Sequence, residues 1–155
     1  EGYIDVYLPD FKYIDDNLAI KYSKAPNYVK TVQEALKEMY SQVGSPVLDE
    51  NGIIKKGLII RHLVLPNQIE NSKRVLKWIE QNLDSSVYVS VMAQYFPTYK
   101  AKGIDELNRK LTMEEYKEIE EYLYSLNLEN GYIQELGEHE EEYVPDFNRN
   151  KENWQ

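Results

Sequence analysis

The chain has 155 residues, 42% apolar and 29% charged, which is enough for one domain with a hydrophobic core. Its formal net charge of −9, without a basic stripe, argues against a nucleic-acid partner. The absence of cysteine excludes disulfides, thiolate metal sites and a cysteine nucleophile within these residues. No apolar run approaches the length of a membrane span and the N-terminus has no signal-like segment, so we expect a cytoplasmic protein with no membrane partner.

The first predicted element is a strand over residues 3–8, in which aliphatic and polar side chains alternate. Its aliphatic face, which ends in Leu8, should pack against covering helices, whereas Asp5 and Tyr7 should share the opposite, mixed face. Pro9 can bend the chain, so this assignment of faces stops there. A chain that starts directly in a strand indicates that residues upstream of it are missing.

Two helical segments and a hairpin are predicted next. A short amphipathic helix over residues 18–22 follows polar residues suited to capping, and Asn27 should cap a longer helix that Gly44 ends. Asn51-Gly52, flanked by apolar residues, predicts a small β-hairpin over residues 47–54.

The most continuously apolar run is GLIIRHLVLPN, residues 57–67, which predicts a buried strand. Arg61 within it is costly to bury unless an anion meets it, and that anion could be Asp5 or a ligand. His62 has the opposite parity and is predicted to be a packed core histidine. Asn71 or Ser72 should cap the helix that follows.

A third strand is predicted over residues 87–94, and Thr112 and Glu115 form a capping box for the helix after it. Asn130-Gly131 should end that helix, and residues 132–136 could form a short strand. We therefore predict one domain over residues 1–136 and an acidic, polar tail over residues 137–155.

Three βα repeats predict an α/β fold with a parallel sheet and right-handed crossovers. The mixed strand faces are typical of the inside of a barrel; they carry Asp5, Tyr7, Arg61, Ser90 and Gln94. Three strands cannot close a barrel. The sequence therefore predicts an incomplete barrel, with a small β-hairpin insertion.

Function in such folds gathers at the carboxyl ends of the strands. The candidates there are Asp10, Lys12, Arg61, Gln94 and Tyr95. Together they suit a ligand with amine and carboxylate or phosphate groups: Arg61 could grip a carboxylate, and Lys12 could pair with an anion or act as an amine nucleophile. The alternatives are a solvated Lys12 and a Tyr95 that only closes the core. The sequence has no phosphate loop, catalytic triad or metal-spaced histidine cluster.

Several motifs resemble the C-terminal part of radical SAM proteins, uncharacterised Fe-S oxidoreductases related to pyruvate formate-lyase activating enzyme. These motifs are YIDVYLPDFKY, GLIIRHLVLP, YVSVMAQYFPTYKA and LNRKLTMEEY, and the resemblance runs over about residues 4–147. It implies a parallel (β/α)6 partial TIM-like barrel, of which this chain is the second half and contains about three βα units.

In that family, a C-x3-C-x2-C loop in the first half binds a [4Fe-4S] cluster, and S-adenosylmethionine (SAM) binds the fourth iron. Reduction cleaves SAM to a radical that abstracts a substrate hydrogen atom. A chain without cysteine cannot bind that cluster. The resemblance therefore implies a C-terminal fragment of such an enzyme, with no cofactor of its own and inactive alone.

The resemblance also assigns site residues. Asp10 and Lys12 match a D-x-K at the SAM and substrate end of the barrel, and Arg61 matches an arginine that reaches the polar groups of SAM. Gln94 and Tyr95 fall where activating enzymes tend to have a histidine near the adenine. No catalytic or metal-binding residue is expected within the fragment.

Three functional hypotheses follow. The first is the radical SAM fragment, whose main partner is the missing N-terminal half of its polypeptide. The second is a standalone, non-catalytic half-barrel that acts as a ligand-binding or interaction module. The third is a metal-free barrel lyase that uses Lys12 as a Schiff base. An unpaired half-barrel edge also predicts a homodimer.

Overall fold

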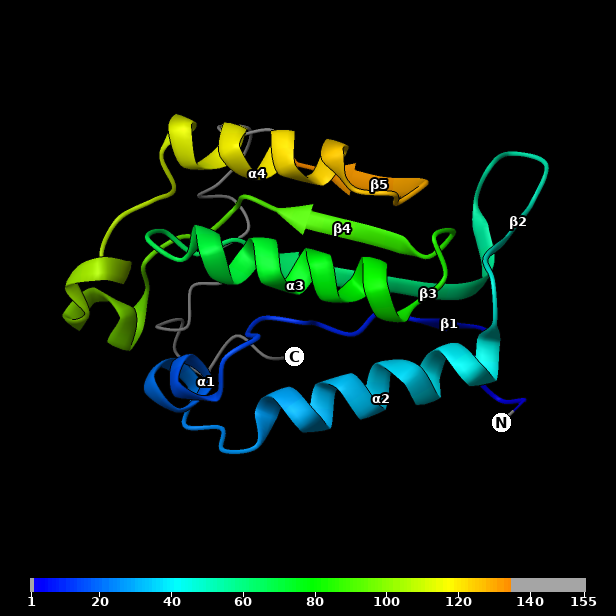
Figure 1. Ribbon diagram of the computed structural model, residues 1–155, viewed down its shortest axis with the longest axis horizontal. Coiled ribbons are helices and arrows are strands. Elements are labelled where there is room, and N and C mark those ends of the chain that lie inside the picture. The colour runs from blue at the N-terminus through cyan, green and yellow to red at the C-terminus, as the bar shows by residue number, and fades with distance from the viewer. Residues whose placement is uncertain (1, 135–155) are drawn as a thin grey trace, which may run out of the picture.

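A mainly parallel sheet with its α-helices on one side forms the fold (Figure 1). The structure, a computed structural model, describes residues 2–134. The helices are α1 (Asp16–Ser23), α2 (Tyr28–Val43), α3 (Ile69–Asn82) and α4 (Met113–Ser125). The strands are β1 (Val6–Tyr7), β2 (Val47–Leu48), β3 (Ile54–Leu63), β4 (Tyr88–Met92) and β5 (Asn130–Ile133). Two short 3-10 helices, η1 (Tyr99–Gly103) and η2 (Asp105–Leu107), lie between β4 and α4.

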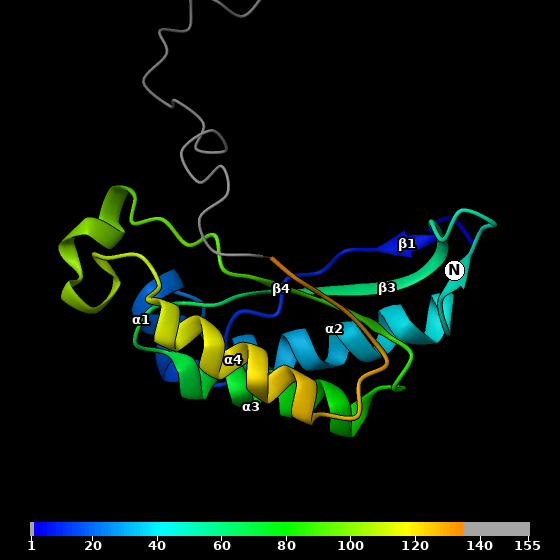
Figure 2. The same ribbon diagram turned by 90° about the horizontal axis from the view of Figure 1, so that it is seen from above.

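The sheet follows the order β1-β3-β4-β5, with every neighbouring pair parallel, and β2 adds antiparallel to β3. Figure 2 shows all four α-helices on one side of this sheet. This is the expected result when strands are added in chain order through right-handed crossovers. The predicted α/β fold and the predicted hairpin are confirmed, and we call the side without these helices the uncovered face.

The core lies between the sheet and the helices. Its fully buried side chains include Leu58, Ile60 and Val89 from the sheet and Val75 and Ile79 from α3. The even-numbered residues of β3 therefore point at the helices, as the predicted strand parity requires. His62 belongs to this buried set and is 0% exposed.

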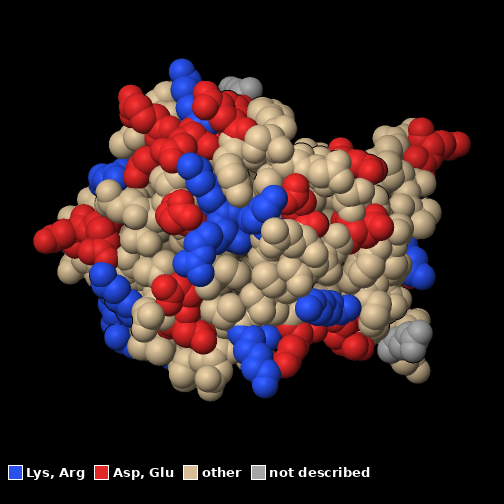
Figure 3. Space-filling view, in the orientation of Figure 1, with Lys and Arg blue, Asp and Glu red and all other residues tan. Residues whose placement is uncertain are grey.

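The helices form where their apolar stripes and caps predict them. In α2, Val32, Leu36 and Val43 are buried; their spacings of four and seven residues place them on one helix face. The capping box of Thr112 and Glu115 at the start of α4 is confirmed. On the helix-covered side shown in Figure 3, basic side chains gather near the middle of the face and acidic side chains gather beside them at the upper left.

The prediction for the first strand is wrong in extent and in facing. Strand β1 has only two residues, Val6 and Tyr7. Tyr7 donates a hydrogen bond to Gln42 Oε1 of α2 at 2.6 Å, so its side chain faces the helices. The register explains this, because Tyr7 pairs with Leu58, which is itself buried beneath the helices. Leu8 has the opposite parity, lies on the uncovered face and is 54% exposed.

Several predicted boundaries also shift. Helix α3 begins two residues before Asn71, so neither Asn71 nor Ser72 caps it, and both side chains are buried. The third predicted strand is shorter than residues 87–94. Asn130 and Gly131 begin β5 instead of ending α4. The predicted tail over residues 137–155 lies outside the described residues.

Asn27 precedes α2 as predicted, but its backbone is left-handed, with a φ of 58°, and its side chain makes no capping hydrogen bond. Within residues 2–134, no helix is both long enough and apolar enough to cross a membrane.

Candidate functional site

Asp10 and Arg61 meet on the uncovered face, where β1 and β3 approach their carboxyl ends. The chain beyond β1 continues alongside β3: Phe11 N donates to Arg61 O and Arg61 N donates to Pro9 O, both at 2.9 Å. This pairing places Asp10 directly beside Arg61. Arg61 Nη2 lies 2.7 Å from Asp10 Oδ1. Within the protein, the carboxylate that meets Arg61 is therefore Asp10 and not Asp5, which was one of the two alternatives.

Lys12 completes a group of three charges with these two residues. Its Nζ lies 3.5 Å from Asp10 Oδ2, so one carboxylate stands between two cations. The guanidinium and Asp10 Oδ1 are at ion-pair distance without hydrogen-bond alignment, and Arg61 Nε is buried without a hydrogen-bond partner in the described part of the chain. The side chains of Lys12 and Arg61 are 44% and 43% exposed, so this group presents one surplus positive charge to solvent, which suits an anionic ligand group.

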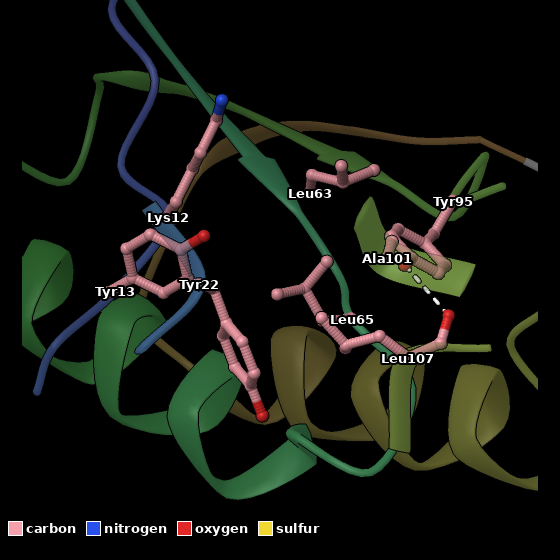
Figure 4. A pocket seen from close by; sticks show the side chains of 8 residues that line it. All are labelled: Lys12, Tyr13, Tyr22, Leu63, Leu65, Tyr95, Ala101 and Leu107. Atoms are coloured by element: carbon pink, nitrogen blue, oxygen red, sulfur yellow. Dashed lines mark hydrogen bonds between the residues drawn. The ribbon is translucent and has the colours of Figure 1, made fainter. Parts of the chain in front are cut away.

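A cavity of about 200 Å³ lies next to this group, between the strand ends, α1 and the 3-10 helices (Figure 4). It is lined by Lys12, Tyr13, Tyr22, Leu63, Leu65, Tyr95, Ala101 and Leu107. In Figure 4, Lys12 and Leu63 stand at one end of the cavity, and Tyr22 and Leu107 at the other. The Lys12 side chain is 44% exposed, so its ammonium group reaches solvent at this end of the cavity, which we call the opening.

The tyrosine hydroxyls around the cavity are bonded back into the protein. Tyr13 Oη and Ser23 Oγ share a hydrogen bond of 2.9 Å, and Tyr95 donates to Leu107 O at 2.9 Å. Tyr22 donates to Glu106 Oε1 at 2.7 Å. Burial and the hydrogen bond with Glu106 raise the pKa of Tyr22, so its hydroxyl stays neutral. Burial also raises the pKa of Tyr95. The rings consequently present apolar surface to the cavity.

The structure brings together four of the five predicted site residues. Tyr95 is buried among apolar residues, so it closes the core, and it also lines the cavity. Gln94 is exposed and does not line the cavity; its Nε2 lies 3.8 Å from Met92 Sδ.

His62 is a packed core histidine, as predicted. Its Nδ1 is 2.7 Å from Phe11 O and its Nε2 is 2.8 Å from Ser72 Oγ. Burial lowers the pKa of His62 to about 4, so the ring is neutral at physiological pH.

A second polar network holds the loop after β3. Arg109 donates to both carboxylate oxygens of Glu115, at 2.7 and 2.8 Å, and to Asn67 Oδ1 at 2.7 Å. Asn67 N donates to Glu115 Oε1 at 2.7 Å, and Asn67 Nδ2 donates to Glu106 O at 2.7 Å. The φ of Asn67 is 62°, in the left-handed region that asparagine and glycine adopt most easily.

Sequence reasoning missed this network and the apolar side of the cavity. Tyr13, Tyr22, Ala101 and Leu107 carry no chemical motif, and only the folded chain brings them together. No group of three or more metal-ligand side chains that could hold a metal ion occurs in residues 2–134.

Comparison with known proteins yields one informative similarity. The chain is 35% identical over 135 residues to the uncharacterized protein MJ0674 of Methanocaldococcus jannaschii. The match covers 85% of this chain but 35% of that protein, so the chain spans about a third of the relative's length. No family model matches the chain, and no solved structure matches it.

Proposed function

We propose that the chain is the C-terminal half of a radical SAM, [4Fe-4S]-dependent enzyme related to pyruvate formate-lyase activating enzyme. The observation that carries this proposal is the group of Asp10, Lys12 and Arg61 at the carboxyl ends of parallel strands. These are the positions where the sequence resembles the SAM-binding end of that family's barrel.

The architecture supports a partial barrel. Four parallel strands follow one another in chain order, and the α-helices lie on one side only (Figure 2). A sheet of this kind curls into a barrel when more βα units extend it, and its uncovered face becomes the interior. Arg61 and Asp10 would then face the inside, where the family binds SAM.

The length of the relative supports a fragment. MJ0674 extends well beyond the region that matches this chain, which leaves room for the βα units of a first half. We propose that this N-terminal half of the same polypeptide is the main partner of the uncovered face.

The two cofactors fit the chain differently. The [4Fe-4S] cluster does not fit, because its ligands are thiolates and the chain has no cysteine. The polar end of SAM does fit: its carboxylate suits the partly exposed guanidinium of Arg61 and the surplus positive charge, and its amine suits Asp10. SAM, when bound, supplies the radical that removes a hydrogen atom from the substrate. Within this chain, Arg61 and Asp10 bind and orient, and Lys12 adds charge at the opening of the cavity.

The test uses the full polypeptide that contains this chain. We expect it to carry a three-cysteine loop upstream, to bind a [4Fe-4S] cluster after anaerobic reconstitution, and to release 5′-deoxyadenosine from SAM under reduction. Arg61→Gln should weaken SAM binding by roughly tenfold or more, since a charge-assisted hydrogen bond is lost. Lys30→Gln, on the exposed side of α2, is the control.

A polypeptide without the upstream cysteines would overturn the radical SAM assignment. If it nevertheless bound SAM or another ligand through Arg61, the alternative of a non-catalytic half-barrel binding module would stand. The observation that favours this alternative is that one cysteine-free chain contains both the charged group and the whole cavity lining.

A further inference from the structure

The cavity beside Lys12 has properties that the SAM proposal does not use. Its volume is about 200 Å³, whereas drug-sized ligands occupy about 300 Å³ or more. A cavity of about 150 Å³ lined by apolar side chains binds benzene. The space therefore suits one ring with a short substituent.

The lining offers apolar contacts and few hydrogen bonds. Leu63, Leu65 and Leu107 provide aliphatic surface, and the hydroxyls of the three lining tyrosines are already bonded to protein atoms. An aromatic ring can pack edge-on or offset against such tyrosine rings. A nucleoside would bring hydroxyls and ring nitrogens that this lining does not satisfy, so the cavity suits a simpler ring.

Charge at the opening selects for an anion. Lys12 stands there, and its neighbour Asp10 is shared with Arg61 at a shorter distance, 2.7 Å against 3.5 Å. At the opposite end, Glu106 pairs with Lys21 and accepts from Tyr22. Around the cavity, the three cations Lys12, Arg61 and Lys21 therefore face two carboxylates, those of Asp10 and Glu106. Of the three cations, Lys12 lies farthest from its carboxylate partner, so it is the one that a ligand anion can pair with most easily.

We propose that this cavity binds a small molecule composed of one aromatic ring and one carboxylate on a short linker. The ring fills the tyrosine- and leucine-lined space, and the carboxylate pairs with the Lys12 ammonium at the opening. This binding site requires no iron, reductant or SAM, so it goes beyond the proposed function and does not depend on it.

Phenylacetate is the probe, with phenylacetamide as its neutral counterpart and acetate as the anion without a ring. Binding is measured by titration calorimetry and by ligand-observed NMR, without iron or reductant. We expect phenylacetate to bind at least roughly tenfold more tightly than either control molecule, because only phenylacetate uses both the cavity and Lys12.

Variants separate the two contributions. Lys12→Met keeps most of the side-chain length and removes the charge, so phenylacetate should bind no more tightly than phenylacetamide. Ala101→Phe fills the cavity from η1 and should abolish binding of both ring compounds, with the far-ultraviolet circular dichroism spectrum unchanged. Lys30→Met is the matched surface control and should bind like the unmodified protein.

Equal binding of phenylacetate and acetate would overturn the proposal, as would a Lys12→Met variant that retains the preference for the carboxylate. Binding of phenylacetate that Ala101→Phe leaves unchanged would place the ligand elsewhere and would also overturn it. None of these results bears on the upstream cysteines or on 5′-deoxyadenosine release, so the radical SAM proposal is tested separately.

Discussion

His62 holds three parts of the chain together from inside the core. It lies on β3, and its two ring nitrogens contact the carbonyl of Phe11 after β1 and the hydroxyl of Ser72 in α3. Burial lowers its pKa from 6.5 to about 4. Between these two values, the unfolded chain binds more protons than the folded one. The stability from this residue is therefore complete above about pH 6.5 and is lost as the pH falls towards 4.

We predict that His62→Gln removes this pH dependence. Between pH 7 and pH 4, the free energy of unfolding of the unmodified protein should fall by about 3 kcal/mol more than that of the variant, which is the size of this pKa difference. Urea denaturation at several pH values measures both. Parallel stability curves for the two proteins over this range would contradict the role given to His62.

At the same scale, Asp10 shows where sequence reasoning stopped too early. Phe11 and Tyr13 are buried, which assigns odd-numbered residues of this segment to the packed side. Following that parity back across Pro9 would have placed Tyr7 on the packed side as well, and Asp10 with Leu8 on the uncovered face. Ending the facing assignment at Pro9 hid both the ion pair with Arg61 and the true orientation of β1.

At the scale of elements, the loop after β3 depends on Glu115 at the start of α4. This carboxylate accepts hydrogen bonds from Arg109, from the backbone of Asn67 and from the backbone of Thr112. The Arg109 hydrogen bonds are the main cause that lowers the pKa of Glu115 to about 2. These hydrogen bonds thus connect α4 to the loop after β3, which also carries Leu65 of the cavity lining.

We predict that Glu115→Gln lowers the free energy of unfolding at pH 7 by about 2 kcal/mol, because charge-assisted hydrogen bonds are replaced by neutral ones. The folded pKa is depressed, so the contribution is present above about pH 4.5 and is lost as the pH falls towards 2. The difference between the two proteins should consequently disappear near pH 2, in a lower range than that of His62.

Glu121→Gln, at an exposed position of the same helix, is the control and should change stability by less than about 0.5 kcal/mol. Chemical denaturation from pH 7 down to pH 2 provides the measurement. A Glu115 effect that persists unchanged at pH 2 would show that packing, not charge, accounts for it.

The helices and strands of this chain could be predicted where the residues that determine them lie close together in the sequence. The stripe of α2 and the capping box of α4 lie within a few residues of one another, and both predictions hold. The start of α3 was misplaced because Asn71 has a capping residue type, yet its side chain bonds to the backbone of Lys12 and Ile14 instead. Such long-range contacts leave no trace in residue spacing.

At the scale of the whole molecule, the sheet has an open edge at β1 and an uncovered face that exposes apolar side chains. Within the described residues, β1 is an edge strand, and Ile4 and Leu8 beside it are 48% and 54% exposed. On β5 of the same sheet, Tyr132 stacks on Tyr88 and is 57% exposed. In the proposed full-length enzyme, the N-terminal half covers this surface. Without that half, exposed edge and face favour association with a second copy.

We predict that the isolated chain forms a dimer through this surface at tens of micromolar concentration. Leu8→Lys should weaken the dimer by at least roughly tenfold, because dimer formation would then remove a charged ammonium group from water. Tyr124→Lys, on the exposed side of α4, should leave association unchanged. Sedimentation equilibrium or light scattering distinguishes these outcomes. A monomeric chain at such concentrations, or equal effects of the two substitutions, would show that the uncovered face does not drive assembly.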